Sequence, residues 1–133
     1  MNRKFKQKID EAVANMGDSA VSDLLMREAF ALAVTPEEKK EAGQYLTQAL
    51  QKRKRADVDV RALMGEMTDA ISLSYLAKRY FGKDRAWLYQ RLNKSLVNGK
   101  PANFTQKELT VLADSLKDLS SKLSDLSQNI ALS

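Results

Sequence analysis

Apolar residues recur at helical spacing along nearly the whole chain, and this pattern predicts a bundle of amphipathic helices. In the first predicted helix they are Phe5, Ile9, Val13 and Met16. In the second they are Val21, Leu24, Leu25, Leu32 and Val34. Between the two helices, Gly17 followed by Asp18 is typical of a helix stop and a new N-cap.

A third helix is predicted to begin at Thr35 and Pro36, because threonine can cap a free backbone N–H and proline suits the first helical position. Glu38 is expected to close a capping box, and Asp57 is expected to cap a fourth helix. The apolar residues of that fourth helix are Val60, Leu63, Met64, Met67 and Ile71. No Gly or Pro interrupts residues 51–64, so the pattern leaves open whether residues 36–66 form one helix or two.

Two short helices are predicted over residues 72–82 and 83–93. Gly82 ends the first and Asp84 caps the second. Two short helices joined by a tight turn with a glycine form a helix-turn-helix unit. Ala77 would let the two helices approach, and Leu88 and Leu92 would face the core. Trp87 and Tyr89 flank that face and are interpreted as packing residues.

The last helix is predicted to start with a capping box formed by Thr105 and Glu108. Its apolar residues alternate in steps of three and four and form an unbroken heptad seam: Leu109, Leu112, Leu116, Leu119, Leu123, Leu126 and Ile130. Two interpretations stay open for the later part of this leucine seam. It either forms a homodimer or packs within the chain against helices between Phe5 and Leu50. The residues concerned are Leu116, Leu119, Leu123, Leu126 and Ile130.

The predicted fold class is therefore all-α: a helical bundle with a helix-turn-helix unit and a long C-terminal leucine-rich helix. The chain has only 5 Gly and 2 Pro in 133 residues and lacks runs typical of strands. We expect an N-terminal helical region over residues 1–56 and a helix-turn-helix-like domain with the long terminal helix over 57–133.

Composition argues against catalysis. The sequence contains no Cys and no His, which excludes thiol nucleophiles and zinc sites of the usual kind and removes the general base of serine and cysteine triads. We expect no enzymatic activity, no cofactor and no small-molecule substrate. The longest apolar run, residues 29–34, is too short to span a bilayer, and the N-terminal segment is amphipathic. A cytoplasmic location without membrane contact is expected.

Positive charge is concentrated in residues 78–107, where eight basic side chains stand against one acidic side chain, Asp84, for a net charge of +7. The whole chain carries only +5. Because cations that neutralise phosphates supply much of the affinity for nucleic acid, this segment favours nucleic-acid binding. A second basic run, residues 52–55, has two interpretations: a solvated helix C-terminus or a patch that contacts phosphate.

Rotation by about 100° per residue places the polar side of the second short helix opposite Leu88 and Leu92. Gln90 and Asn93 carry amides that can pair with adenine edges in a major groove, with cations around them to hold phosphates. The predicted duplex-DNA site is Lys83, Arg85, Ala86, Gln90, Asn93, Lys94 and Lys100. A DNA-binding transcriptional regulator is the leading functional hypothesis. The alternative is a non-enzymatic helical adaptor that binds other proteins, with this face merely solvated.

Residues 60–119 resemble the lambda-repressor-like family of DNA-binding domains. The resemblance rests on Ala77 and Gly82 at the turn, on residues 97–101, and on the leucine-rich helix that follows. It implies a recognition helix at residues 83–93. The family usually has four residues from the small alanine to the glycine, whereas this chain has five, which predicts a wider turn. The loop before Thr105 is also longer than in the family.

Residues 71–123, especially 85–93 and 97–105, resemble an uncharacterised family of short Bacteroidetes proteins. This resemblance implies a bacterial cytoplasmic protein and provides no function to transfer.

Overall fold

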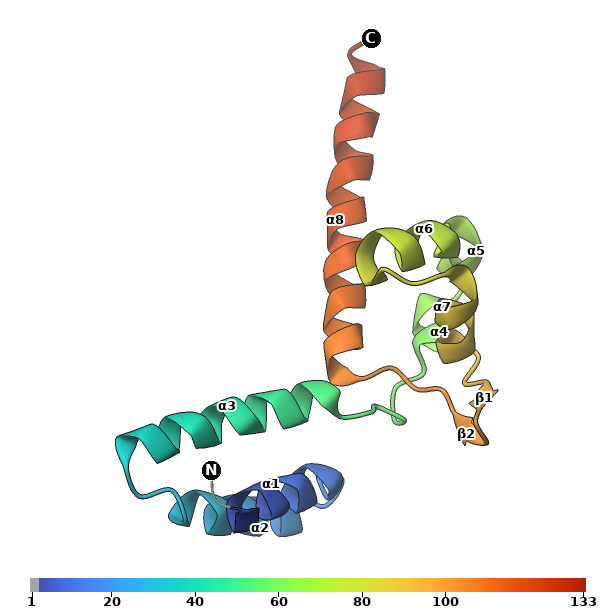
Figure 1. Ribbon diagram of the computed structural model, residues 1–133. Helices are drawn as coiled ribbons and strands as arrows, with labels where there is room; N and C mark the ends of the chain where they lie inside the picture. The colour runs from blue at the N-terminus through green and yellow to red at the C-terminus, as the bar shows by residue number, and fades with distance from the viewer. Residues whose placement is uncertain (1–2) are drawn as a thin grey trace. The chain divides into compact units, whose positions relative to one another are not determined.

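The computed structural model describes residues 3–133, and its contacts divide the chain into two compact units. The first unit ends at Arg53 and the second is Lys54–Ser133. Met1 and Asn2, the start of the predicted N-terminal region, lie outside the described residues. The first unit contains the helices α1 (Arg3–Ala14), α2 (Ser19–Ala31) and α3 (Pro36–Lys52) (Figure 1).

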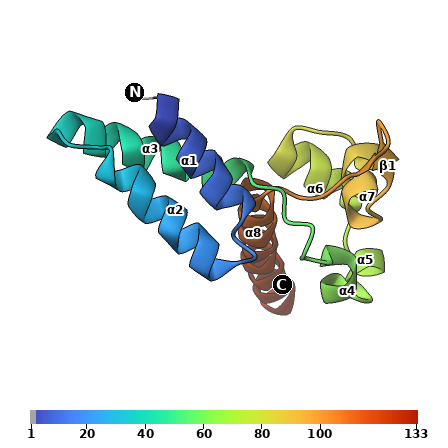
Figure 2. The same cartoon turned by 90° about the horizontal axis from the view of Figure 1, so that it is seen from below.

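The first unit has a hydrophobic core of its own. Helices α1 and α2 lie side by side (Figure 2). Phe5 and Ile9 of α1 are almost completely buried, and the small residues Ala29 and Ala42 let the other helices approach them. The ring of Phe5 meets the ring of Phe30 edge-on with centroids 5.7 Å apart. The helical spacing predicted from the sequence therefore matches the buried side of α1.

The N-caps of this unit follow the sequence prediction with one exception. The side chain of Asp18 accepts a hydrogen bond from the Val21 N–H at 3.3 Å, and Thr35 Oγ1 accepts one from the Glu38 N–H at 3.1 Å. The carboxylate of Glu38 accepts from the N–H of Val34, at 3.1 Å, and not from that of Thr35. The predicted capping box is thus wrong in its second half: Glu38 reaches the residue before the cap.

The chain leaves α3 at Lys52 and does not become helical again until Val60, so residues 36–66 form two helices. Tertiary pairing explains the break, because the Arg55 N–H donates to the Phe104 carbonyl at 2.7 Å and holds this segment extended. The predicted cap of the fourth helix is wrong by two residues. Asp59 accepts from the Ala62 N–H at 3.1 Å, whereas Asp57 binds the Arg55 guanidinium at 2.8 Å.

The second unit is built around one core. Its elements are α4 (Val60–Met64), α5 (Met67–Ala70), α6 (Leu73–Leu76), the π-helix η1 (Ala77–Phe81), α7 (Arg85–Leu92), β1 (Leu96–Val97), β2 (Lys100–Pro101) and α8 (Gln106–Ala131). Its buried core residues are Val60, Leu73, Leu76, Ala77, Leu88, Leu92, Phe104 and Leu112. Across the described residues the fold is nearly all helical, which confirms the predicted all-α class and the long C-terminal helix.

The extra residue between Ala77 and Gly82 is accommodated by η1. The Ala77 carbonyl accepts hydrogen bonds from the N–H groups of Gly82 and Lys83, so the chain makes a π turn in place of an α turn. Gly82 then takes a left-handed conformation, with φ of 62°, and Asp84 caps α7 directly afterwards. The prediction of a wider turn is wrong. The extra residue is taken up in the wider π-helix η1, and the connection between η1 and α7 stays short.

A small hairpin, β1–β2, follows α7. Leu96 pairs with Pro101 and Val97 with Lys100 in antiparallel register. The two connecting residues, Asn98 and Gly99, both have positive φ (53° and 77°), as a tight two-residue hairpin turn requires. The strands have two residues each, so no strand-like run reveals them in the sequence.

Helix α8 starts at the predicted capping box. Thr105 Oγ1 accepts from the Glu108 N–H at 3.2 Å, and Glu108 Oε1 accepts from the Thr105 N–H at 2.9 Å. The Tyr80 hydroxyl donates to Asp118 Oδ2 at 2.6 Å and so links η1 to α8. This bond lowers the pKa of Asp118 and raises that of Tyr80, because it stabilises the carboxylate and holds the phenol proton.

We expect Gly82→Ala to lower the free energy of unfolding by about 1–2 kcal/mol, because a Cβ disfavours the left-handed conformation. Gly82→Asn should cost clearly less, since asparagine tolerates it. No atom lies within 4 Å of the position of an added Cβ, so sterics do not confound the comparison. Urea unfolding measures both variants. Equal losses would contradict the conformational explanation.

Deletion of the exposed residue Lys78 should convert η1 into an α turn and preserve the fold of the second unit. Deletion of Ala86 from α7 is the matched control. It rotates Leu88 and Leu92 by about 100° away from the core and should unfold the unit. Near-ultraviolet circular dichroism measures tertiary packing in both. Loss of packing on deletion of Lys78 would show that the extra residue is required.

Candidate functional site

Helix α7 has one buried face and one open face. The side chain of Asp84 accepts a hydrogen bond from the Trp87 N–H at 2.9 Å and fixes the start of the helix. Leu88 and Leu92 are 1% and 3% exposed and anchor it in the core, as predicted. The opposite face is open to solvent and presents three of the predicted site residues: Ala86, Gln90 and, just past the end of the helix, Asn93. Lys83, which precedes the cap, and Arg85, the first residue of the helix, are exposed at its start.

Two predicted site residues already bind within the chain. Asn93 Oδ1 accepts a hydrogen bond from the Arg61 guanidinium, and Lys94 Nζ donates to the Ala56 carbonyl at 2.8 Å. Lys94 is half-buried and has a positive φ of 51°. Asn93 therefore ties the end of α7 to α4, and Lys94 ties it to the segment that leads into α4.

The arginines of α7 lie against aromatic rings. The Arg85 guanidinium is 4.8 Å from the centre of the Tyr89 ring, and the Arg91 guanidinium is 4.2 Å from that of Trp87. Arg91 Nε also binds Glu108 Oε1 at 3.2 Å. Trp87 and Tyr89 are partly buried against the core, which agrees with their interpretation as packing residues. The aromatic rings hold the arginines in defined positions.

A cavity of about 590 Å³ opens between α7, the hairpin β1–β2 and the segment at Lys54. We call it the basic cleft. Its lining residues are Lys54, Trp87, Gln90, Arg91, Val97, Asn98, Lys100, Pro101, Ala102 and Asn103. Three of these are cations from separate parts of the sequence, and none is acidic. The cleft is thus a locally positive surface with amides at its edge, suited to an anion.

The basic cleft brings together only two of the predicted site residues, Gln90 and Lys100. Lys83 and Ala86 are exposed but do not line it, and Arg85 lines a different cavity together with Asp69. Arg91 is absent from the site predicted from the sequence. It lines the cleft only together with residues of the hairpin β1–β2, which the sequence does not predict. Lys54 is also absent from the predicted site.

Lys54 belongs to the basic run of residues 52–55, whose members lie in different places. Lys52 ends α3, in keeping with a helix C-terminus. Lys54 pairs with Thr105 in an isolated antiparallel bridge and lines the cleft. Arg55 Nη1 donates a hydrogen bond to Gln106 Oε1 at 2.5 Å. The Arg55 guanidinium also donates to Asp57, and this hydrogen bond raises the pKa of the guanidinium.

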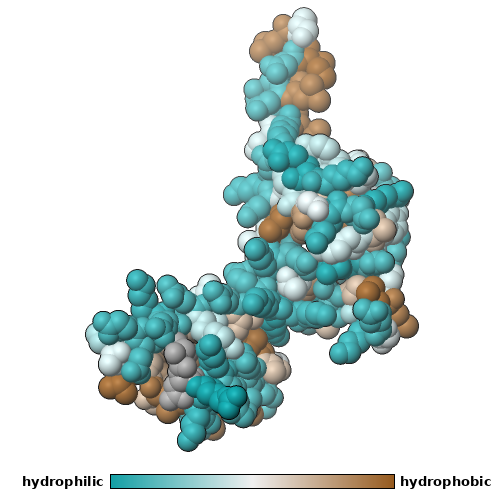
Figure 3. Space-filling model, viewed as in Figure 1, coloured by the Kyte–Doolittle hydropathy of each residue, from teal (hydrophilic) through white to brown (hydrophobic). Residues whose placement is uncertain are grey.

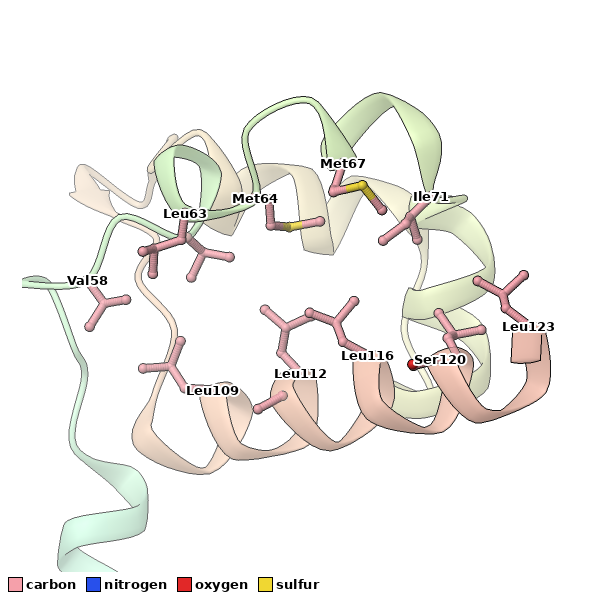
Figure 4. Close-up of a pocket in the computed structure, with 13 residues that line it drawn as sticks. Val58, Leu63, Met64, Met67, Ile71, Leu109, Leu112, Leu116, Ser120 and Leu123 are labelled. Atoms are coloured by element: carbon pink, nitrogen blue, oxygen red, sulfur yellow. The ribbon is translucent and has the colours of Figure 1, made fainter. Parts of the chain in front are cut away.

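A second cavity, of about 620 Å³, lies between α4, α5 and α8 and is lined almost wholly by apolar side chains. We call it the apolar groove. Leu63, Met64 and Met67 point across it toward Leu109 and Leu116 (Figure 4). The full lining is Val58, Val60, Leu63, Met64, Met67, Ile71, Leu109, Leu112, Ala113, Leu116, Leu119, Ser120 and Leu123.

The leucine seam divides into two parts along α8. Leu109, Leu116 and Leu119 are partly buried against the core that contains Leu112. The distal residues Leu123, Leu126 and Ile130 are 63%, 54% and 66% exposed. Hydrophobic atoms are visible along this distal end of α8 (Figure 3). The core covers the first half of the leucine seam, and the second half extends past the core and is exposed to solvent.

Over residues 3–133, none of the helices is both long enough and apolar enough to cross a membrane.

A family model described as a domain of unknown function (DUF5053) matches residues 60–130, which include α4 to α7, the hairpin and nearly all of α8. Neither a curated protein nor a solved structure matches the chain. Both the apolar groove and α7 lie almost wholly within the matched residues, whereas Lys54 lies before them.

Proposed function

Because the protein belongs to the DUF5053 family, whose function is unknown, its own residues must indicate its activity, and we propose that it binds duplex DNA through α7 and the basic cleft. The family match confirms the predicted resemblance to a family of unknown function. We also propose that the protein acts in the bacterial cytoplasm as a transcriptional regulator and needs no cofactor.

The observation that carries the proposal is the composition of the basic cleft. Lys54 is distant in sequence from Arg91 and Lys100, yet all three line one cavity that has no acidic lining residue. Glu108 pairs with Arg91, whereas Lys54 and Lys100 have no carboxylate within salt-bridge distance among the described residues. Such cations hold the phosphates of a nucleic-acid backbone and orient the protein on it.

The position of α7 supports a recognition role. Helix α6 with η1, the turn at Gly82 and α7 follow one another as the helices of a helix-turn-helix unit do. Gln90 is exposed on α7 and lines the basic cleft, so an amide able to pair with an adenine edge lies beside cations able to hold phosphates. Ala86 and Lys83 extend the same open face toward the start of the helix.

An adaptor role is the second candidate, and the exposed distal part of the leucine seam favours it. A protein partner would be held by apolar contacts, whereas DNA would be held by cations. The two functions therefore respond differently to salt: binding to DNA weakens steeply as salt is added, and apolar association does not.

Removing the cleft cations tests the DNA proposal. We expect the double variant Lys54→Ala/Lys100→Ala to bind a random duplex more weakly and to reduce the slope of log affinity against log salt by about 2, since each phosphate contact contributes about 0.9. Fluorescence anisotropy with a labelled duplex at several salt concentrations measures both quantities.

The matched control is Lys39→Ala/Lys40→Ala, which removes the same charge from exposed positions of α3 in the first unit. It should leave the slope nearly unchanged. The proposal is wrong if the wild-type chain shows no binding at low salt, or if both double variants lose affinity equally.

Replacing Gln90 tests base recognition separately. Gln90→Ala should remove discrimination worth about 1–3 kcal/mol at one base pair while leaving binding to random duplex and the salt slope unchanged. Selection from a randomised duplex pool, carried out with both proteins, measures the preference. An unaltered preference would show that Gln90 does not contact a base.

A further inference from the structure

The second unit has two apolar surfaces that remain open to water. One is the apolar groove, in whose wall Leu63 is 80% exposed and Met67 is 47% exposed. The other is the distal ridge, which we define as Leu123, Leu126 and Ile130; Leu123 also lines the end of the groove, so the two surfaces meet there. Contiguous exposed apolar surface of this kind marks an interaction site in a folded protein.

We propose that the apolar groove binds the distal ridge of a second copy of this chain, so that two α8 helices pair antiparallel about a two-fold axis. Each copy has one groove and one ridge. A two-fold arrangement therefore covers both surfaces in both copies and leaves no open site at which the assembly would grow further. A parallel pair would place ridge against ridge and leave both grooves empty.

The spacing within α8 favours a second copy as the occupant. The heptad pattern continues without a break from the groove residues into the ridge, so a helix with the same pattern meets the groove in register. At a rise of 1.5 Å per residue, the groove side from Leu109 to Leu119 is about 15 Å long. The ridge from Leu123 to Ile130 is about 10 Å long and fits within that length.

A two-fold axis that passes α8 at the level of residue 121, on the side of the helix that carries Ser120, fixes the partners. It places Leu126 of one copy over Leu116 of the second copy, and Ile130 beside Leu112 of the second copy. Leu132, which is 86% exposed, then reaches the end of the groove at Leu109. All of the exposed apolar residues in the distal part of α8 are covered in this arrangement.

Small and uncharged residues make the approach of a second helix feasible. Ala113 and Ser120 line the groove from α8, are exposed, and stand one heptad apart; Ser127 continues the series. Small side chains at these positions let two helix axes come close. No lining residue of the groove is charged. Lys122, beside the ridge, is paired with Asp118 at 3.1 Å. The apolar ridge is therefore a better occupant than a charged surface.

The dimer does not depend on DNA binding, and its test contains no nucleic acid. In sedimentation equilibrium over a range of concentrations, we expect the wild-type chain to dimerise and both Leu126→Lys and Leu63→Lys to weaken association at least tenfold. These side chains lie on different elements, and each is more than half exposed, so the fold of a single copy does not need them. Circular dichroism checks that helix content is unchanged.

Gln128→Lys is the matched control, because it adds the same charge to the distal part of α8 on the side away from the seam. It should associate like the wild type. A chain that stays monomeric at every concentration overturns the proposal. Loss of dimer with Leu126→Lys but not with Leu63→Lys also overturns it, since that result describes a coiled coil that does not use the groove.

A single introduced cysteine tests the two-fold axis, because the chain has no cysteine of its own. Ser120→Cys should form a disulfide-linked dimer on mild oxidation, since the axis brings this position close to its counterpart in the second copy. Ser121→Cys, its exposed neighbour on the other side of α8, should not. Equal cross-linking of the two variants contradicts the antiparallel arrangement.

Discussion

The second unit depends on one hydrophobic core that joins Leu88 and Leu92 of α7 to Leu112 of α8. These leucines share one core with Leu76, Ala77 and Leu112, so α6, η1, α7 and α8 are fixed relative to one another by a single set of apolar contacts. The position of the hairpin follows, because it leaves the end of α7 and leads to the buried Phe104 just before α8. Both the basic cleft and the apolar groove are formed on the surface of the elements that this core holds together.

Much of the second unit is predictable from local chemistry. The caps at Asp84 and Thr105 each depend on a side chain and a backbone N–H three residues away, and the stop at Gly82 depends on the conformation of that one residue; all three appear as expected. The buried face of α7 follows from helical spacing alone. Signals of this kind need no knowledge of distant contacts, which is why sequence reasoning identifies them.

What the sequence does not reveal depends on tertiary contacts. Lys54 reaches the cleft because the backbone beside it pairs with Phe104 and Thr105, more than forty positions away. Arg91 becomes a cleft residue only once the hairpin has folded beside α7. Asn93 and Lys94 have side chains suited to DNA contact, yet Arg61 and the Ala56 carbonyl engage them. Residue type indicates what a side chain can bind, and the fold determines which partner it meets.

The presence of two hydrophobic cores has a consequence for how the molecule tolerates change. Among the described residues, Phe5 and its neighbours form one buried cluster and Leu88 and its neighbours form another, so a cavity opened in one cluster leaves the side chains of the other in place. Unfolding then need not be a single cooperative event, and one melting temperature would not describe the chain. Sequence change in the first unit can accumulate without direct damage to the core that positions α7, which leaves the two units free to diverge at different rates.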